Sequence, residues 1–375
     1  MRSPHTAVVA YEMEGRPTGL GRYLEGLLGG LASLDAGRFS LFFKGDPFDH
    51  PLWADGNGVF EAHFDHRPEA HPILWEQLRL PRLLRRGTFD LLFSPANALP
   101  PGLKMPSLVT IHDLSFEHLG EEFGWKERWR RRFLARRAAR RATRILTDSG
   151  AGARDLQATY GLGPQRLGIV PLGLDPKFFD DGNPREDLSR LRALDVKPPY
   201  LLFSGTLLPR RHPELLLIAF ETLAAEHPDL DLVLNGSNAL PDPAAFERRI
   251  EASPVAQRIH RLGYVPEDTL VPLYRQAELT FYLSSLEGYG LPPLESLAAG
   301  TLAVVSDGLA LDDLWPDYAY RCPRLTTEDV IATTRAALED DHRGAVSEEG
   351  VERMKSLTWE RAAQVFLEEM RRVLP

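Results

Sequence analysis

The chain has 375 residues, of which 43% are hydrophobic and 26% charged, an ordinary balance for a globular protein too long for one core. Its net charge of −9 excludes a general nucleic-acid binder, because little positive charge is available to neutralise phosphates. The sequence shows no apolar run of membrane-spanning length and no secretory leader pattern. Cys322 is the single cysteine, which excludes an internal disulfide and a cysteine metal cluster and fits a reducing cytoplasm.

Short apolar runs alternate with segments of helical length along the whole chain. In the first half we expect strands at residues 7–11, 39–44, 59–64, 90–94, 107–113, 144–148 and 167–171. Helical patterns lie between several of them, at 20–34, 73–86 and 125–142. This alternation predicts a parallel sheet that is covered by helices on both faces.

A stretch rich in proline, glycine and aspartate, 171–199, separates this half from a second one with the same alternation. The second half predicts strands at 200–204, 230–235, 258–264, 279–283 and 302–306, and helices at 213–226, 243–251, 267–276 and 292–299. We therefore predict an α/β protein of two Rossmann-like doubly wound domains facing a cleft, with ligands at the carboxyl ends of the strands. The predicted parts are an N-terminal domain (1–178), a linker (179–198), a C-terminal domain (199–356) and a final helix with one apolar face (357–375).

The strongest candidate site is the run SSLEGYGLPPLES at 284–296, which follows an apolar strand and opens a helix. Gly288 and Gly290 let the backbone approach a ligand closely, and the free N–H groups of a helix start suit an anionic phosphate. Glu287 precedes the turn and Glu295 lies about one turn inside the helix, so both carboxylates can face one ligand. Taken alone, the pattern fits a plain strand–turn–helix with solvated glutamates equally well.

Two adjacent arginines, Arg210 and Arg211, follow the strand at 200–204 and precede a helix. The guanidinium group is the side chain best suited to bidentate contact with a diphosphate. Adjacent arginines on a loop are more often simply solvated, and that alternative stays open.

Two shorter patterns lie in the first half. Gly19 and Gly21 open a helix after the first strand, and they form either a cradle for phosphate or sugar or an ordinary tight turn. His112 and Asp113 close the strand at 107–113, where a histidine points into the predicted cleft and can donate to a sugar hydroxyl or a phosphate. A lone histidine is more often structural, so only its position favours a role in the site.

The segment 126–144 carries ten basic residues and one acidic residue, Glu127. Trp129, Phe133 and several alanines at helical spacing give it an apolar side. Such a helix either contacts anionic lipid or an anionic acceptor, or presents a solvated face.

Together these motifs resemble the retaining glycosyltransferases of family 4, which share the two-domain GT-B fold. The resemblance runs over nearly the whole chain. Glu287 and Glu295 match the family's Glu-x₇-Glu motif, its most specific signature. Further matches are the glycine loop at 19–23, the strand ends at 94–97 and 112–114, the segment at 170–175, the arginine loop at 205–211 and the nucleobase pocket at 262–265 with Leu270 and Tyr274. The helix around Trp359 resembles the one that, in this fold, crosses back onto the N-terminal domain.

The resemblance implies a role for each matching residue. His112 would stabilise the sugar or the leaving phosphate, and Glu287 would face the donor sugar. Arg210 and Arg211 would neutralise the diphosphate, while Glu295 would hold the ribose hydroxyls. The other implied substrate-binding residues are Gly19, Gly21, Asn97, Asp113, Thr206, Gly236, Tyr264, Val265, Leu270, Gly288, Tyr289, Gly290 and Leu291.

Three positions depart from the pattern of many relatives. Arg211 stands where many have lysine, and Leu208 where many have glutamate. The arginine loop, which resembles the family's diphosphate clamp, therefore keeps a positive charge at Arg211 and loses a negative charge at Leu208. Thr206 stands where some relatives carry an arginine directly after the glycine. The positive charge of this diphosphate clamp is therefore better defined by the sequence than the arrangement of its side chains.

The expected chemistry needs neither a metal nor a cofactor, because Asp229 and Asp231 precede a strand instead of following one. The resemblance implies retention of anomeric configuration, with the donor phosphate taking the proton of the acceptor. The motifs look most like bacterial mannosyl- or related hexosyltransferases of polysaccharide assembly, which favours GDP-mannose as donor, then UDP-glucose. The acceptor would be a saccharide or a lipid-linked group.

Two other interpretations stay open. The first is a nucleotide-sugar epimerase with the same fold, and the second is a non-catalytic protein that binds a nucleotide sugar or a partner transferase. We expect a cytoplasmic protein, peripheral on the inner face of the membrane through 126–144, with no nucleic-acid partner.

Overall fold

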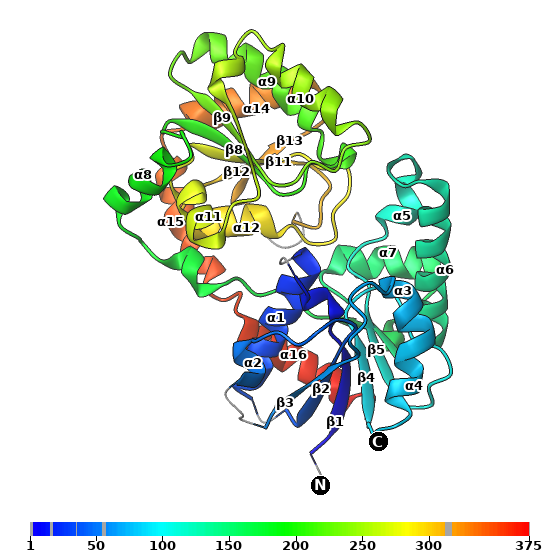
Figure 1. Ribbon diagram of the computed structural model, residues 1–375. Helices are drawn as coiled ribbons and strands as arrows, with labels where there is room; N and C mark the ends of the chain where they lie inside the picture. The colour runs from blue at the N-terminus through cyan, green and yellow to red at the C-terminus, as the bar shows by residue number, and fades with distance from the viewer. Residues whose placement is uncertain (1–2, 16–17, 35, 55–57, 312–316, 375) are drawn as a thin grey trace. The chain divides into compact units, whose positions relative to one another are not determined.

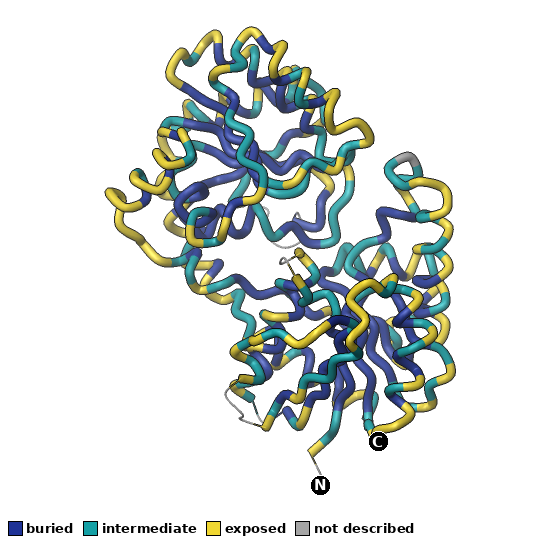
Figure 2. The backbone as a smooth tube through the Cα atoms, in the orientation of Figure 1, coloured by how far each residue is buried: buried dark blue, intermediate teal, exposed yellow. Residues whose placement is uncertain are grey.

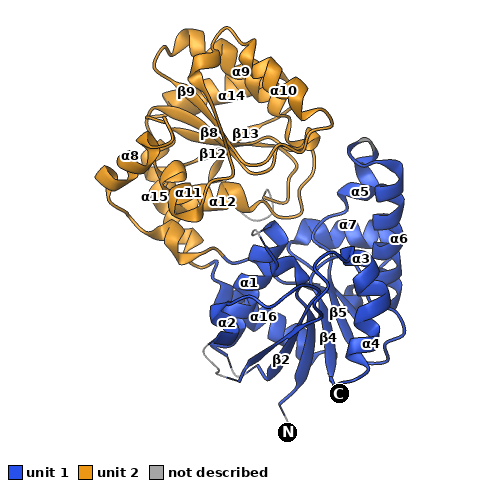
Figure 3. Ribbon diagram, viewed as in Figure 1, with its two compact units in different colours: residues 1–173, 357–375 blue, residues 174–356 orange. Residues whose placement is uncertain are grey.

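The computed structural model describes residues 3–15, 18–34, 36–54, 58–311 and 317–374. The chain divides into two compact units (Figure 3): unit 1 is 1–173 with 357–375, and unit 2 is 174–356. Each unit is built on a parallel sheet of its own, so the predicted fold class of two Rossmann-like domains is confirmed. Residues 1–2 and 375, at the ends of the predicted parts, lie outside the described residues.

The sheet of unit 1 has seven strands in the order β3-β2-β1-β4-β5-β6-β7 (Figure 1). Their bounds are β1 (His5–Val9), β2 (Arg38–Phe43), β3 (Phe60–Phe64), β4 (Leu91–Ser94), β5 (Ser107–Thr110), β6 (Arg144–Thr147) and β7 (Leu167–Ile169). The central strands are buried along nearly their whole length (Figure 2), as parallel strands covered on both faces must be. The order reverses between β1 and β4, which opens a crevice for ligands at their carboxyl ends.

The described helices of unit 1 connect these strands. They are α1 (Gly19–Ala32), α2 (Pro51–Ala54), α3 (Pro72–Leu74), α4 (Leu80–Leu84), α5 (Ser115–His118), α6 (Trp125–Arg141), α7 (Gly150–Tyr160) and α16 (Trp359–Arg371). A π-helical segment, η2 (Trp75–Arg79), joins α3 to α4, so the helix predicted at 73–86 is present in three pieces. The alanines of α6 face the core, whereas Trp129 and Phe133 are 66% and 53% exposed, so they do not share one apolar side as predicted.

The C-terminal helix α16 belongs to unit 1 because glycines on α1 make room for it. A Cβ atom on Gly26 would lie 2.1 Å from the Trp359 ring, and one on Gly30 would lie 2.3 Å from the Trp359 carbonyl oxygen. Phe366 packs against Phe93 of β4 with ring centroids 4.6 Å apart. The return of the chain to unit 1 is therefore fixed by close helix packing.

The sheet of unit 2 has six strands in the order β10-β9-β8-β11-β12-β13. Their bounds are β8 (Tyr200–Ser204), β9 (Asp231–Asn235), β10 (Ile259–Gly263), β11 (Leu279–Tyr282), β12 (Ala303–Ser306) and β13 (Ala319–Cys322). Its described helices are α8 (Pro184–Arg192), α9 (Pro213–Glu226), α10 (Pro243–Glu251), α11 (Glu267–Arg275), α12 (Leu291–Ala298), α14 (Thr327–Glu339) and α15 (Arg343–Met354). Again the order reverses, between β8 and β11, and the carboxyl ends there are the expected ligand position.

The segment 179–198, predicted as a linker, contains α8 and is part of unit 2. Asn183 caps this helix by accepting a hydrogen bond from the Arg185 N–H, and Pro184 occupies its first turn. Asp187 of α8 pairs with Arg275 of α11 at 2.6 Å. The stretch predicted as a linker thus contains a helix that Asn183 and Pro184 begin.

Candidate active site

In unit 2, three neighbouring strands end in glycines that adopt left-handed backbone conformations. Gly205 after β8 and Gly236 after β9 both have φ of +124°, and Gly263 at the end of β10 has φ of +68°. A Cβ atom on Gly236 would lie 2.0 Å from the Gly205 carbonyl oxygen, so only glycine fits there. The carboxyl edge of β8 and β9 thus has bare backbone next to the arginine loop.

Arg210 and Arg211 converge on the carboxylate of Glu287 at this edge. Arg211 Nε donates to Glu287 Oε1 at 2.9 Å, and Arg210 Nε lies 3.6 Å from the same oxygen. Ser284, in the loop that follows β11, also donates to Glu287 Oε1, at 3.1 Å. The Arg210 carbonyl accepts from the Ser285 N–H at 2.9 Å, which holds the two loops together. The structure therefore brings the three predicted residues into one cluster.

The cluster carries two guanidinium groups and one carboxylate, so it has a net positive charge. All three side chains are mostly buried, with 9–14% exposure. Burial lowers the pKa of Arg211, but the neighbouring Tyr282 and Glu287 raise it by more, and the net shift is upward. Burial raises the pKa of Tyr282 above its ordinary range, and the Arg211 guanidinium lies 5.4 Å from its ring centroid. These fixed, desolvated cations suit a phosphate-bearing ligand.

Helix α12 begins beside this cluster. Gly290 precedes its first residue with φ of +103°, and as a glycine it has no side chain with which to cap this helix start. Leu291 lies at the first helical position, where its backbone N–H points out of the helix. Tyr289 is 4% exposed, so its side chain anchors the turn and leaves backbone to face outward. Gly288, in the same turn, follows Glu287 directly.

Glu295 lies one turn inside α12 and is 4% exposed. Its Oε2 accepts a hydrogen bond from the Tyr274 hydroxyl of α11 at 3.0 Å. The Glu295 carboxylate is therefore buried and held by Tyr274, a residue of the predicted nucleobase pocket.

The remaining residues predicted for unit 2 lie further along the same edge. Thr206 follows Gly205, and its Oγ1 accepts from Ser237 Oγ at 3.4 Å. Tyr264 follows β10 and is 53% exposed, whereas Val265 and Leu270 are buried. Because β10 is separated from β8 by β9, these last three residues stand apart from the arginine cluster.

In unit 1 the carboxyl ends of β5 and β6 bring His112 and Asp148 together. His112 Nδ1 lies 2.7 Å from Asp148 Oδ2, and its Nε2 lies 3.0 Å from the Pro95 carbonyl oxygen. The Tyr23 ring of α1 packs edge-on against the imidazole with centroids 4.7 Å apart. This histidine is held on three sides by β4, β6 and α1.

Both polar neighbours of His112 are acceptors, and this arrangement favours the imidazolium form, in which both ring nitrogens donate. Burial lowers the pKa of His112, but the Asp148 carboxylate and the Pro95 carbonyl outweigh it and raise the pKa above its ordinary value. A positive charge is thus held at the carboxyl edge of this sheet. It can stabilise developing negative charge on a bound ligand.

Four other predicted residues surround this edge. Thr18 caps α1 by accepting from the Gly21 N–H at 3.0 Å, and a Cβ on Gly21 would lie 2.6 Å from the Glu12 carbonyl oxygen. Gly19 has open space around it. Asp113 accepts from the Ser115 N–H at 2.9 Å and so acts as a local cap.

Asn97 has φ of +38°, and its Oδ1 is buried without a hydrogen-bond partner among the described residues. Asp148 Oδ1 is also buried and likewise has no hydrogen-bond partner among the described residues. These two unused acceptors follow β4 and β6, on either side of β5, and they mark this edge as a place for a ligand with hydroxyl or N–H groups.

Three residues of these clusters were not predicted as site residues: Asp148, which was expected only as the end of a strand, Ser284 and Tyr282. A buried acid near Tyr11, which follows β1, was not predicted either. Glu76, on the π-helical segment η2, is 1% exposed and accepts from the Tyr11 hydroxyl at 3.1 Å. A π-helical turn is often found at functional sites, but no signal in the sequence predicts one here.

Burial raises the pKa of Glu76 from 4.5 to about 7, with hydrogen bonds from Tyr11 and Gln77 lowering it and Glu12 raising it. Between pH 4.5 and about 7, the Glu76 carboxyl group is therefore protonated in the folded state and ionised in the unfolded state. Its contribution to stability is full below pH 4.5 and is lost as the pH rises through about 7. The loss amounts to about 3 kcal/mol for a shift of this size.

We therefore expect the free energy of unfolding of the wild type to fall between pH 5 and pH 8. In Glu76→Gln this free energy should fall by about 3 kcal/mol less over the same range. Denaturant unfolding of both proteins at the two pH values measures this difference. Glutamine keeps the shape and the Tyr11 hydrogen bond, so it serves as its own packing control. Parallel pH dependences in the two proteins would contradict the assignment.

Two doubly wound units, each with a charged polar cluster at the carboxyl edge of its sheet, define the GT-B class of fold. The family model "Glycosyltransferase Family 4" matches residues 17–178, and "Glycosyl transferases group 1" matches residues 184–350. The two halves of the chain therefore match family models of glycosyltransferases, which places the chain with the family 4-like proteins of the GT-B fold.

Individual relatives agree with this placement. The D-inositol 3-phosphate glycosyltransferase of Corynebacterium glutamicum is 28% identical over 55% of this chain and 51% of its own length. The O-antigen chain mannosyltransferase B of Escherichia coli is 26% identical over 77% of both chains. The chain thus spans about half the length of the first of these curated relatives.

Among solved structures, the Anabaena protein HepE in complex with UDP-glucose superimposes with a TM-score of 0.75 over 98% of this chain and 99% of its own. Its sequence identity is 14%, so it shows the shared fold. In the described residues, no helix is long and apolar enough to cross a membrane.

Proposed function

We propose that this protein is a retaining glycosyltransferase that moves a hexose, with mannose favoured, from a nucleoside diphosphate sugar to a saccharide or lipid-linked acceptor. The observation that carries the proposal is the convergence of Arg210 and Arg211 on Glu287, beside the uncapped start of α12. Fixed cations and a helix start stabilise the charge that develops on a departing diphosphate, and they need little reorganisation to do so. The donor site so built calls for no metal and no cofactor.

In this proposal Glu287 has two tasks. It holds both arginines in place, and its carboxylate faces the donor sugar, where it stabilises an oxocarbenium-like transition state. The donor phosphate, once its charge is balanced by the arginines, takes the proton of the acceptor hydroxyl. Retention follows, because the acceptor then attacks the face from which the diphosphate leaves.

The acceptor side belongs to unit 1 in this proposal. The imidazolium of His112 stabilises the sugar or the leaving phosphate, and Asn97 and Asp148 supply free acceptors for hydroxyl groups. Gly21 is needed for the close packing of α1 that places the Tyr23 ring against His112. The identity of the acceptor is set by loops that vary between proteins of one fold.

GDP-mannose is the favoured donor and UDP-glucose the second candidate. The E. coli relative is named a mannosyltransferase, which supports the first, and the Anabaena structure contains UDP-glucose, which supports the second. A thermal-shift screen of GDP, UDP and ADP tests donor binding. The preferred diphosphate at a hundred times its dissociation constant stabilises the fold by about 2.7 kcal/mol. No shift with any of the three would contradict a nucleotide-sugar donor.

We expect Glu295→Ala to weaken binding of the preferred diphosphate by about 1.5–3 kcal/mol, since a charged acceptor for the ribose hydroxyls is lost. Calorimetry measures the change. Glu251→Ala is the matched control, because it removes an exposed glutamate of α10 outside the proposed site and should leave the affinity unchanged. Unchanged affinity in Glu295→Ala would remove this residue from the site.

Two alternatives would share the same donor site. A nucleotide-sugar epimerase would convert the donor without an acceptor, and a non-catalytic binder would hold it without turnover. The Glu287 cluster and the imidazolium of His112 favour turnover over binding alone, because a protein that only binds needs no charge prepared at a second edge.

We also propose that the helical segment 126–144 contacts anionic membranes. Trp129 and Phe133 stack with centroids 5.5 Å apart and are exposed, which suits a membrane interface. Several of the ten basic residues are engaged by acids: Glu127 pairs with Arg130 and Arg131, Glu117 with Arg132 and Arg136, and Glu369 with Arg144. The remaining cations each contribute roughly 1 kcal/mol near an anionic surface.

Sedimentation with vesicles checks this contact. We expect the protein to pellet with anionic vesicles at low salt and to stay in solution with neutral vesicles or at high salt, because the attraction fades within a Debye length. Trp129→Gln with Phe133→Gln should weaken pelleting without changing the charge. No pelleting with anionic vesicles at low salt would count against the contact.

A further inference from the structure

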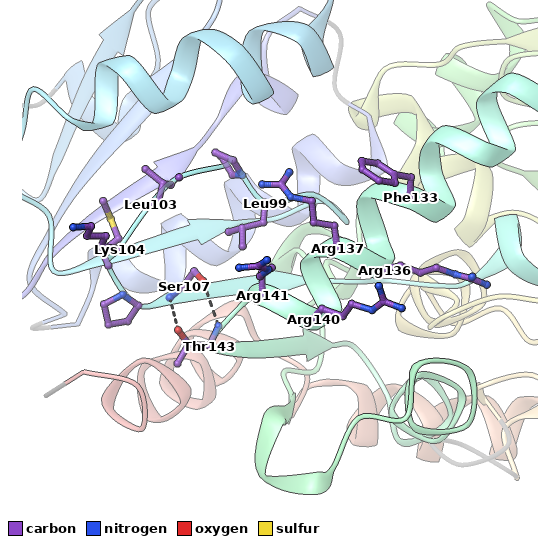
Figure 4. A pocket seen from close by; sticks show the side chains of 14 residues that line it. Leu99, Leu103, Lys104, Ser107, Phe133, Arg136, Arg137, Arg140, Arg141 and Thr143 are labelled. Carbon is purple, nitrogen blue, oxygen red and sulfur yellow. Dashed lines mark hydrogen bonds between the residues drawn. The ribbon is translucent and has the colours of Figure 1, made fainter.

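A pocket of about 920 Å³ lies within unit 1, away from the candidate active site (Figure 4). One wall is the C-terminal half of α6, and the other is the chain between β4 and β5, residues 99–106. Its size falls in the range of small-molecule sites, which is about 300–1,000 Å³.

The pocket lies at the amino ends of β5 and β6. Ser107 begins β5 and Thr143 directly precedes β6, and both residues line the pocket. They are joined by two reciprocal hydrogen bonds, from the Ser107 N–H to Thr143 Oγ1 at 3.0 Å and from the Thr143 N–H to Ser107 Oγ at 3.3 Å. His112 and Asp148 follow the carboxyl ends of the same two strands. His112 lies five positions after Ser107 along β5 and the chain that follows it, a distance of about 16 Å if the chain is extended.

The charge of the pocket is one-sided. Five of its lining residues are cationic, Lys104, Arg136, Arg137, Arg140 and Arg141, and its described lining contains no acidic residue. This is unusual in a chain with a net charge of −9. The cations also come from two separate segments, since Lys104 lies on the loop before β5 and the arginines on α6.

Two of these arginines are held in position by their neighbours. Arg136 pairs with Glu117 at 2.9 Å, and Arg137 Nη1 donates to Gln77 Oε1 at 2.6 Å. Lys104, Arg140 and Arg141 have no acidic partner within the described ranges of the chain. The pocket therefore combines two fixed guanidinium groups with three cations that are ready to bind.

Helix stabilisation accounts for only part of this cluster. Basic residues in the last turn of α6 interact well with the helix dipole, which explains Arg140 and Arg141. It does not explain Lys104 on a separate loop. Partial burial lowers the pKa of Arg137, and the like charge of Arg141 lowers it further. The cations therefore repel one another in the absence of an anion.

Apart from Ser107 and Thr143, the rest of the lining is apolar or glycine. Leu99, Leu103 and Met105 stand on the loop, and Phe133 of α6 is 53% exposed at the rim. In the view of Figure 4, the side chains of Arg137 and Arg141 lie on either side of Leu99. A ligand that fits both surfaces has an anionic end and an apolar end.

We propose that this pocket binds a phosphate ester with an apolar substituent, as a second anion site independent of the donor site. The phosphate lies against Arg137 and Arg141, since guanidinium groups bind phosphate oxygens in a bidentate manner. The apolar part lies against Leu99 and Leu103. A phospholipid headgroup and a soluble organic phosphate share this chemistry. The site does not depend on the proposed glycosyl transfer, because all its lining residues lie in unit 1 at the edge opposite His112.

The test uses the full chain and three probes: dihexanoyl phosphatidate, dihexanoyl phosphatidylcholine and inorganic pyrophosphate, all below their micellar range. Calorimetry gives affinities, and amide hydrogen exchange gives the place of binding. We expect phosphatidate to slow exchange in 99–107 and in the C-terminal half of α6. We expect Arg140→Gln with Arg141→Gln to weaken this binding at least about tenfold, as for loss of charge-assisted hydrogen bonds.

Arg185→Gln with Arg192→Gln is the matched control, because it removes the same charge from two exposed residues of α8 in unit 2. It should leave phosphatidate binding unchanged. Preference for phosphatidate over pyrophosphate is the result expected for a phosphate ester with an apolar substituent, and equal affinities for the two would contradict the apolar part of the ligand. Absence of protection in 99–107 with every phosphate probe, or equal weakening in both double variants, would overturn the proposal. Neither result bears on donor binding, which depends on Arg210 and Arg211.

Discussion

Replacing both Arg210 and Arg211 with alanine is expected to weaken binding of the preferred nucleoside diphosphate by about 3–6 kcal/mol, or about a hundredfold to ten-thousandfold. Each arginine is assigned a charge-assisted contact with the diphosphate, and these contacts are about twice as strong as neutral ones. The bare nucleoside should lose little affinity, since neither side chain is assigned to base or ribose. Calorimetric titration of both ligands measures the difference.

The double variant also leaves Glu287, which is 9% exposed, without its cationic partners. Two controls separate this effect from lost phosphate contacts. Adding Glu287→Gln to the double variant removes the stranded charge, and Arg210→Lys with Arg211→Lys keeps the positive charge but loses the bidentate geometry. We expect the lysine variant to bind diphosphate with intermediate affinity. Equal losses for nucleoside and diphosphate would mean that the arginines act through structure.

His112→Gln is expected to lower turnover by about 10²–10³, a typical cost of removing one preorganised electrostatic group, because glutamine lacks the positive charge of the protonated ring. The dissociation constant of the nucleotide should change little, because His112 belongs to unit 1 and the proposed nucleotide site to unit 2. Steady-state rates together with calorimetry separate the two quantities. Wild-type turnover in this variant would remove His112 from the chemistry.

Asp148→Asn tests the charge state of the same histidine. Asp148 helps to raise the pKa of His112, so wild-type imidazolium persists above the pH at which histidine ordinarily loses its proton. The asparagine variant removes the charge and keeps the shape, so its activity should fall at a lower pH than that of the wild type. A pH–rate profile unchanged by Asp148→Asn would show that the imidazolium is not needed.

The architecture was largely predictable from the sequence, because buried parallel strands are continuous apolar runs. The strands at 200–204 and the helices at 213–226 and 243–251 were predicted with the bounds that the structure has. The last strand, β13, was not predicted, since its first three residues are half-exposed and it contains Arg321. The helix α8 was missed because its residues pair with α11, and this long-range contact leaves no local pattern.

The site was predictable only in part. Strand ends and glycines pointed to the loop around Glu287 and to the arginines, because these features are local in the sequence. The partners that tune them come from elsewhere in the chain: Asp148 charges His112, and Tyr274 anchors Glu295. The raised pKa of Glu76 depends on its burial on a π-helical turn, and the spacing of hydrophobic residues in the sequence does not predict such a turn.

The central claim is that this protein breaks the bond between the sugar and the diphosphate of a nucleotide sugar. Incubation of the protein with GDP-mannose and with UDP-glucose, followed by NMR spectroscopy, tests it most directly. Water can replace the missing acceptor, so we expect slow release of free sugar and nucleoside diphosphate from one donor, and none from Arg210→Ala with Arg211→Ala. Conversion of the donor into a second nucleotide sugar would instead establish an epimerase. Binding of a donor that stays intact throughout would contradict glycosyl transfer.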